Sequence, residues 1–276
     1  MNWFKLVKHD LHDGIPCLRI LLPFAQFFLF CAVCHAELGQ LSSDLTVIDY
    51  LIFFFRGTKA TSLVQGLKEF QIPILWLQGT GCLMYLCLDY PIRDLTKTGQ
   101  QILVRYNSKM GWFASKCIWN IAYTLIYFCS SIIAALCFAL LTNGNIVFRN
   151  TPSITMLYTE SFSPIFLSNK EIIVSVFCAP LFTLAALNIL QMLLSFFIRP
   201  IYAFLFVVSS LMLTTYLESS FILGNGAMII RSVHITGKSS SVSPNVVIAL
   251  SCCIIVLCVL VGLRYFRKYD VLDYEE

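Results

Sequence analysis

The chain has 276 residues, of which 58% are hydrophobic and 12% are charged, and its formal net charge is +4. Soluble domains contain about 45–50% apolar and about 25% charged residues, so this composition excludes an ordinary water-soluble protein. Apolar stretches of bilayer length recur along the whole chain, which predicts an all-α integral membrane protein forming one domain over 1–276. The small net charge gives no reason to expect a nucleic-acid partner.

Residues 1–14 predict an amphipathic helix that lies on the inner membrane surface. Trp3, Val7 and Leu11 recur at helical spacing among charged residues, a pattern typical of interfacial helices. A solvated tail is the alternative. Residues 9–13 (HDLHD) include metal-binding side-chain types, but a solvated helix face explains them as well, and we expect no metal site.

Six segments are apolar enough to cross a bilayer, which requires about 20 residues each. They cover 15–36, 72–90, 112–141, 171–198, 201–217 and 246–266. Only Arg199 and Pro200 separate the fourth from the fifth, so we expect a tight turn between two antiparallel helices. The apolar run 45–55 is too short to span and contains Asp49, so we expect an interfacial or re-entrant segment there.

The positive charges set the expected orientation. Most of the 19 lysines and arginines fall on one side of the predicted membrane when the N-terminus is placed inside. Cytosolic loops of membrane proteins are enriched in these residues, so both termini are predicted to be cytosolic. The first apolar stretch is too long for a signal peptide, and we expect it to remain in the mature protein.

Sequence motifs for catalysis and for ion coupling are missing. The chain has no HExxH, GxSxG or P-loop pattern, so we do not expect an enzyme. It also lacks a series of acids or arginines within the spans, which disfavours an ion-coupled carrier, a cation pore and a voltage sensor. The haem-attachment pattern of residues 31–35 (CAVCH) falls inside the first span, where we expect no haem.

Three uncharged polar residues within the spans form the candidate substrate path: Gln78, Asn188 and Gln191. A polar side chain inside a membrane needs a hydrogen-bond partner. Asn188 and Gln191 are three residues apart and therefore share a helical face. These side chains either join helices to one another or line a path at a subunit interface, and the sequence leaves both interpretations open.

The longest cytosolic loop is the candidate partner-binding element. Residues 91–116 combine apolar side chains at helical spacing with several cations. A short helix with an apolar strip and flanking charge suits docking into a groove on a soluble subunit. A loop that contacts only lipid is the alternative.

This loop resembles that of a known family. Residues 99–105 (GQQILVR), followed by 108–109 and 112–116, resemble the loop between the second and third helices of ABC-2 type permeases. These permeases are the membrane subunits of ABC transporters whose ATPase is a separate polypeptide. The C-terminal residues 264–272 and the segment 49–57 are also similar to segments of this family.

The resemblance implies a permease that pairs with a second copy or a paralogue in the bacterial plasma membrane, surrounded by lipid. It implies export of an amphiphilic peptide, drug or lipid-like cargo, a coupling loop at 91–111 and an exoplasmic gate segment at 218–245. The nucleotide-binding ATPase subunit would hold ATP and Mg²⁺, and this chain would bind no cofactor. The implied ATPase-coupling residues are Arg93, Asp94, Leu95, Gly99, Gln100, Gln101, Leu103 and Arg105.

Two other functions remain open on the sequence alone. One is a channel or carrier that works without an ATPase, and the other is a membrane scaffold or assembly factor. Association with a nucleotide-binding subunit distinguishes the permease from both.

Overall fold

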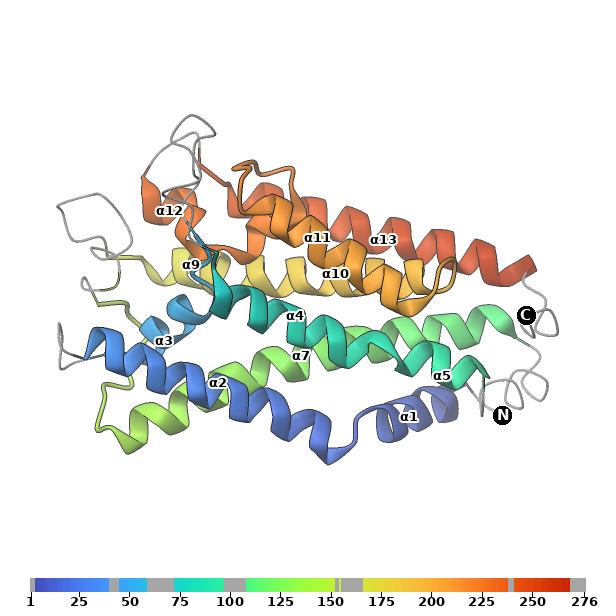
Figure 1. The fold of residues 1–276 in the computed structure, drawn as a ribbon, viewed down its shortest axis with the longest axis horizontal. Coiled ribbons are helices and arrows are strands. Elements are labelled where there is room, and N and C mark those ends of the chain that lie inside the picture. The colour runs from blue at the N-terminus through green and yellow to red at the C-terminus, as the bar shows by residue number, and fades with distance from the viewer. Residues whose placement is uncertain are drawn as a thin grey trace.

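The computed structural model describes residues 3–39, 45–58, 72–96, 108–151, 154, 166–237 and 241–268. Throughout these ranges the regular structure is helical and no β-strand is formed, which confirms the predicted all-α class. The helices form an elongated bundle (Figure 1). The start of α1 and the end of α13 lie at the same end of this bundle (Figure 1).

Four helices are long and apolar enough to cross a membrane. They are α2 (Cys17–Leu38), α7 (Lys109–Leu141), the continuous helix Asn169–Ser195 and α13 (Pro244–Lys268). Two further apolar helices, α4 (Ile74–Leu88) and α11 (Pro200–Thr214), have 15 residues each. At 1.5 Å per residue they are about 22 Å long, less than the roughly 30 Å hydrocarbon thickness of a bilayer. A helix therefore occupies each predicted span, but two of the six are short.

Prolines mark the beginnings of these helices. Pro16 and Pro73 directly precede α2 and α4, and Pro200 and Pro244 open α11 and α13. The first turn of a helix has backbone N–H groups without an intrahelical partner, so the missing N–H of proline costs nothing there. The predicted turn at Arg199 accordingly ends where α11 begins.

The helix Asn169–Ser195 contains a wider π-helical turn. It consists of α9 (Asn169–Ile172), the π-helical η1 (Ile173–Cys178) and α10 (Ala179–Ser195). The chain enters α9 through a capping box in which Ser168 and Glu171 each accept a bond from the other's backbone N–H. Pro180 follows the π-helical turn and has no N–H with which to continue the α-helical pattern.

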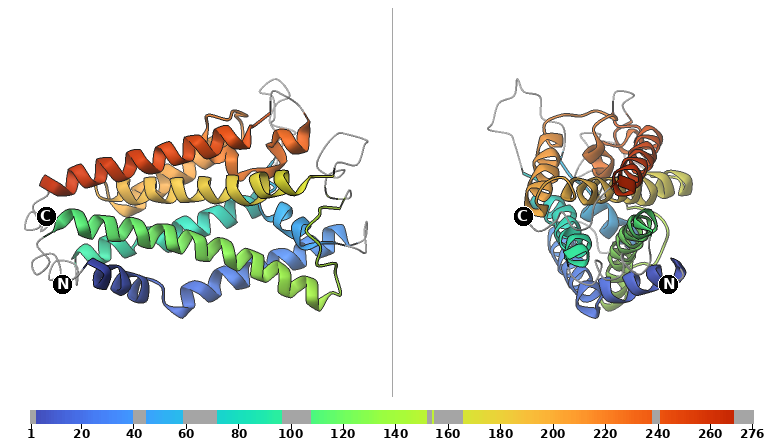
Figure 2. Two further views of the ribbon diagram at one scale, coloured as in Figure 1. Left: turned by 180° about the vertical axis from the view of Figure 1, so that it is seen from behind. Right: turned by 90° about the vertical axis from the view of Figure 1, so that its right-hand side faces the viewer.

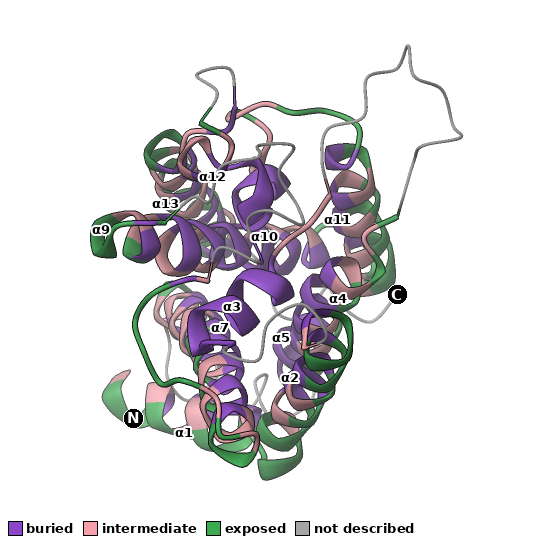
Figure 3. Ribbon diagram, turned by 90° about the vertical axis from the view of Figure 1, so that its left-hand side faces the viewer, coloured by how far each residue is buried: buried purple, intermediate pink, exposed green. Residues whose placement is uncertain are grey.

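The predicted interfacial or re-entrant segment forms a short buried helix, α3 (Val47–Phe54). All eight of its residues are buried, and the helix lies in the centre of one end of the bundle (Figure 3). A capping box opens it: the Asp49 carboxylate accepts from the Thr46 N–H at 2.9 Å, and Thr46 Oγ1 accepts from the Asp49 N–H at 3.3 Å. The Asp49 carboxylate also accepts from the Thr151 N–H at 2.8 Å. Burial raises the pKa of the Asp49 carboxyl despite these bonds. At eight residues α3 is too short to cross a bilayer.

The predicted gate segment packs back against this same end of the bundle. It contains η2 (Leu223–Ala227), η3 (Ile229–Arg231) and α12 (Val233–Thr236). The Ile229 N–H donates to the Phe55 carbonyl at 2.8 Å, and Trp76 Nε1 donates to the Ala227 carbonyl at 2.8 Å. The segment is thus fixed to the chain after α3 and to α4, while its role as a gate stays a prediction.

The opposite end of the bundle holds α1 (Trp3–Gly14) and α5 (Tyr90–Thr96). Helix α1 packs beside the N-terminal part of α7, as both views in Figure 2 show. It buries Leu6, Asp10 and Gly14, which are four residues apart and form one stripe. Helix α1 was expected to lie on a membrane surface. Its most buried face packs against other helices of the protein.

Candidate functional site

Three charged side chains meet in the interior between α1, α5 and α7. Lys116 Nζ lies 2.6 Å from Asp10 Oδ1 and 2.6 Å from Asp94 Oδ2. The exposed fractions are 0% for Lys116, 1% for Asp10 and 8% for Asp94. We call these three residues the charge cluster. Charged groups this deeply buried are tolerated only when they are paired and hydrogen-bonded.

Neutral donors complete the coordination of the two carboxylates. The Tyr90 hydroxyl donates to Asp10 Oδ1 at 3.0 Å, Trp112 Nε1 donates to Asp94 Oδ2 at 3.0 Å, and the Ser115 hydroxyl also donates to Asp10. Two carboxylates face one ammonium group, so these donors offset the excess negative charge. Burial, followed by the nearby Asp10 charge, raises the pKa of the Tyr90 hydroxyl, which keeps it protonated as a donor.

Aromatic rings enclose the cation. Lys116 Nζ lies 4.7 Å from the centre of the Tyr90 ring and 5.1 Å from that of Trp112. Ring faces at this distance attract a cation, and they also exclude water. The charge cluster therefore has a dry aromatic wall on the side of α5 and α7.

The charge cluster joins three helices that are distant in sequence. Asp10 is contributed by the buried stripe of α1, Asp94 by α5 and Lys116 by α7. A buried ion pair adds little net stability compared with apolar packing, but losing one partner leaves an uncompensated charge. The arrangement thus fixes one relative position of α1, α5 and α7. Helix α5 leads directly into residues 97–107, which belong to the predicted coupling loop.

A glycine allows the close approach of α1 to this site. A Cβ atom on Gly14 would lie 2.8 Å from Tyr90 Cζ and would also overlap the Trp119 ring nitrogen. We expect Gly14→Ala to lower the free energy of unfolding by about 1–3 kcal/mol, the usual cost of overpacking. Thermal unfolding in detergent micelles measures the change.

Gly81 provides the matched control for this prediction. A Cβ atom on Gly81, inside α4, would meet nothing within 4 Å. Gly81→Ala should be neutral or stabilise the protein by about 0.5–1 kcal/mol, because alanine favours a helix interior. Equal effects of the two substitutions would show that α1 does not dock as described.

The predicted ATPase-coupling residues divide into two groups. Arg93 is exposed on α5, whereas Asp94 and Leu95 are buried. Leu95 belongs to an apolar cluster that also contains Leu6, Trp112 and Phe266. Among the predicted coupling residues that the structure describes, Arg93 alone has an exposed side chain. Gly99, Gln100, Gln101, Leu103 and Arg105 lie outside the described residues.

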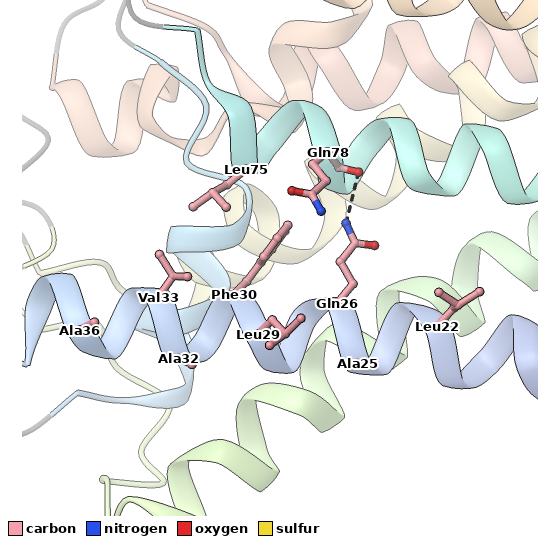
Figure 4. Close-up of a pocket in the computed structure, with 10 residues that line it drawn as sticks. All are labelled: Leu22, Ala25, Gln26, Leu29, Phe30, Ala32, Val33, Ala36, Leu75 and Gln78. Atoms are coloured by element: carbon pink, nitrogen blue, oxygen red, sulfur yellow. Dashed lines mark hydrogen bonds between the residues drawn. The ribbon is translucent and has the colours of Figure 1, made fainter.

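The predicted substrate-path residues are not brought together. Asn188 is fully buried, and its Nδ2 lies 3.1 Å from both Cys87 Sγ and Thr124 Oγ1. Gln191 Nε2 donates to the Met84 carbonyl at 2.8 Å. These two amides join α10 to α4 and α7, as polar residues between membrane helices commonly do. Gln78 is exposed and lines a groove between α2 and α4 (Figure 4).

Sequence reasoning missed Asp10 and Lys116, although one signal for them was present. Lys116 lies seven residues inside the long apolar helix α7. A lysine inside an apolar helix needs a partner, and Asp10 has the matching charge. Asp10 lies among the polar residues 9–13, so the sequence favoured a solvated helix face for it.

These features define an all-helical bundle whose four long helices, by length and composition, place it among helical membrane proteins. Polar side chains inside the bundle join its helices, and a charge cluster fixes one of its ends. No family model, curated protein or solved structure matches the chain.

Proposed function

We propose that the chain is the membrane-spanning permease subunit of an ATP-driven ABC exporter in a bacterial plasma membrane. The proposal comprises six spans, cytosolic termini, pairing with a second copy or a paralogue, and a separate ATPase subunit that holds ATP and Mg²⁺. The cargo would be an amphiphilic peptide, drug or lipid-like molecule. The resemblance of the loop after α4 to that of ABC-2 type permeases supports this proposal.

The single observation that carries the proposal is the anchoring of α5 by the charge cluster. A coupling element has to pass a push from an ATPase to the membrane helices. Asp94 joins α5 to Lys116 of α7 through a 2.6 Å ion pair. At 33 residues α7 is about 50 Å long, so it reaches well beyond a roughly 30 Å hydrocarbon layer. Movement of α5 would therefore be transmitted to α7 as a rigid-body shift.

The arrangement of the helices supports the proposed topology. Helices α2, α4, α7, α10, α11 and α13 follow the long axis of the bundle, each in the direction opposite to the one before (Figure 1). An even number of crossings returns the chain to its starting side. Exposed cations gather at the end where α1 starts and α13 finishes, as expected of a cytosolic face. They include Lys5, Lys8, Arg93, Arg199, Arg264, Arg267 and Lys268.

A charge reversal on α5 tests the proposal. The chain is expressed together with the ATPase encoded beside it, and the complex is purified through a tag on the chain. We expect Arg93→Glu to weaken ATPase binding about tenfold. The substitution replaces a positive charge at the proposed contact with a negative one, which would repel an acidic group of the ATPase that pairs with Arg93. Binding of the purified ATPase to the chain in nanodiscs measures the change.

Lys8→Glu is the matched control, since Lys8 is an exposed cation at the same end but on α1. It should change ATPase binding by less than about twofold, the range of a surface charge outside a contact. If no nucleotide-binding subunit is retained by the unaltered chain, the permease proposal is wrong. Equal weakening by both substitutions would show a general charge effect instead of a contact at α5.

A further inference from the structure

An open groove of about 730 Å³ lies between α2 and α4 (Figure 4). Leu22, Ala25, Leu29, Ala32 and Ala36 of α2 form most of its wall, and Leu75 of α4 contributes from the other side. The lining residues of α2 extend from Leu22 to Ala36, and the 14 steps between these two residues correspond to about 21 Å along the helix. We call this feature the α2–α4 groove. It is long, open and predominantly apolar.

Two glutamine amides lie at the groove, and they differ in their hydrogen bonding. The Gln26 amide is hydrogen-bonded within the protein, because its Nε2 donates to the Gln78 backbone carbonyl at 3.2 Å. The Tyr127 hydroxyl lies 3.4 Å from Gln26 Oε1 but donates its proton to the Gly79 carbonyl at 2.6 Å. The Gln78 side chain is exposed and extends from α4 over the groove (Figure 4). Within the described part of the chain, its amide has no hydrogen-bond partner.

The position of Gln78 makes an amide without a hydrogen bond energetically unfavourable. Its backbone is level with Gln26, which lies near the middle of α2, one of the helices long enough to cross a membrane. A polar group in hydrocarbon without a hydrogen bond is strongly disfavoured. An occupant of the groove that bonds the Gln78 amide would remove this cost.

The shape of the face argues against a second copy of the chain as this occupant. In a two-fold dimer the same hollow surface would meet itself, and two facing hollows cannot reach the close packing of a protein interior. The exposed face of α13 offers a comparison, because its Val256, Leu257 and Leu260 are all apolar. The α2–α4 groove differs from the exposed face of α13 because it is concave and because the exposed Gln78 amide lies over it.

We propose that the α2–α4 groove binds an elongated apolar molecule from the membrane that has an amide part-way along its length. The apolar arms lie along the alanine and leucine side chains of α2. The amide of the molecule donates to Gln78 Oε1 and accepts from Gln78 Nε2, which pairs both functions of the glutamine. The groove volume falls within the roughly 300–1,000 Å³ of small-molecule sites, which are mostly apolar with a few placed polar groups.

This site goes beyond the proposed function and does not depend on it. Binding would occur with the chain alone in a bilayer, whether or not an ATPase associates. The two proposals can therefore fail separately.

Photolabelling of the full chain in lipid nanodiscs tests the site. The probe is a dialkyl amide with a diazirine on one alkyl arm, and the matched probe has methylene groups in place of the amide. We expect the amide probe to label peptides of α2 and α4. Gln78→Leu should lower this labelling about threefold to tenfold, the effect of one hydrogen bond within a membrane, and leave labelling by the hydrocarbon probe unchanged.

Two further variants identify the groove as the site. Ala32→Trp fills the groove at an exposed position and should abolish labelling of α2 by both probes, while Leu257→Trp on the exposed face of α13 should change nothing. Undiminished labelling of α2 in Ala32→Trp would overturn the proposal. So would equal labelling of Gln78→Leu and the unaltered chain by the amide probe, or protection of the groove by a second copy of the chain.

Discussion

Replacing Lys116 with methionine is expected to lower the free energy of unfolding by about 3–5 kcal/mol, the usual cost of removing one partner from a buried ion pair. The substitution leaves the carboxylates of Asp10 and Asp94 without a cation in a site from which water is excluded. Methionine has a similar length and fills the same space, so the loss reports on charge more than on packing. Unfolding in mixed detergent micelles measures the change.

Two companion variants make this result specific. Lys268→Met removes an exposed cation at the same end of the bundle and should alter stability by no more than about 0.5 kcal/mol. Adding Asp10→Asn to Lys116→Met should restore part of the lost stability, because one uncompensated charge disappears. Additive losses in the double variant would contradict the pairing described between α1 and α7.

Replacing Arg231 with methionine should have an effect of similar size, about 3–5 kcal/mol. Arg231 is 1% exposed, and its guanidinium donates to the carbonyls of Thr214, Thr215 and Thr58 and to Asn225 Oδ1. The first two carbonyls belong to the end of α11, where a helix has unsatisfied acceptors and a partial negative charge. Burial lowers the pKa of Arg231 to about 10, which still leaves it protonated at neutral pH. Its removal would orphan several buried acceptors at once.

Arg231→Lys separates charge from geometry at this site. Lysine keeps the positive charge but lacks the planar fork of donors, so it should recover only part of the stability lost in Arg231→Met. Amide hydrogen exchange should accelerate first in the gate segment and at the end of α11, which the arginine connects. Full rescue by lysine would show that charge alone holds this end together, and an unchanged exchange pattern would contradict the described contacts.

The helices were predictable because each is a continuous apolar run bounded by proline or a change in polarity. The run 171–198 corresponds to the helix Asn169–Ser195, and 112–141 corresponds to Lys109–Leu141. The non-spanning character of α3 was also foreseeable from its length. Hydropathy does not report where within or beyond an apolar run the helix begins and ends. Helices α4 and α11 are therefore shorter than the predicted segments 72–90 and 201–217.

The candidate site was mostly not predictable. Asp10 and Lys116 are separated by 106 residues, and their pairing depends on how α1 docks onto α7, which no local pattern encodes. Asp94 and Leu95 were expected to face a partner because the loop has helical spacing, but helical spacing alone does not say which face turns inward. The sequence shows Gln78 as a polar residue within an apolar run, whereas its difference from Asn188 appears only once the neighbouring helices are in place.

The long sequence separation within the charge cluster sets an order of events during synthesis. At about 5–20 residues per second, Asp10 leaves the ribosome roughly 5–20 s before Lys116 does. Throughout that interval water or the polar membrane surface has to solvate its carboxylate. Helix α1 is made well before α7, and it can reach its final position only after the chain has been synthesised into α7.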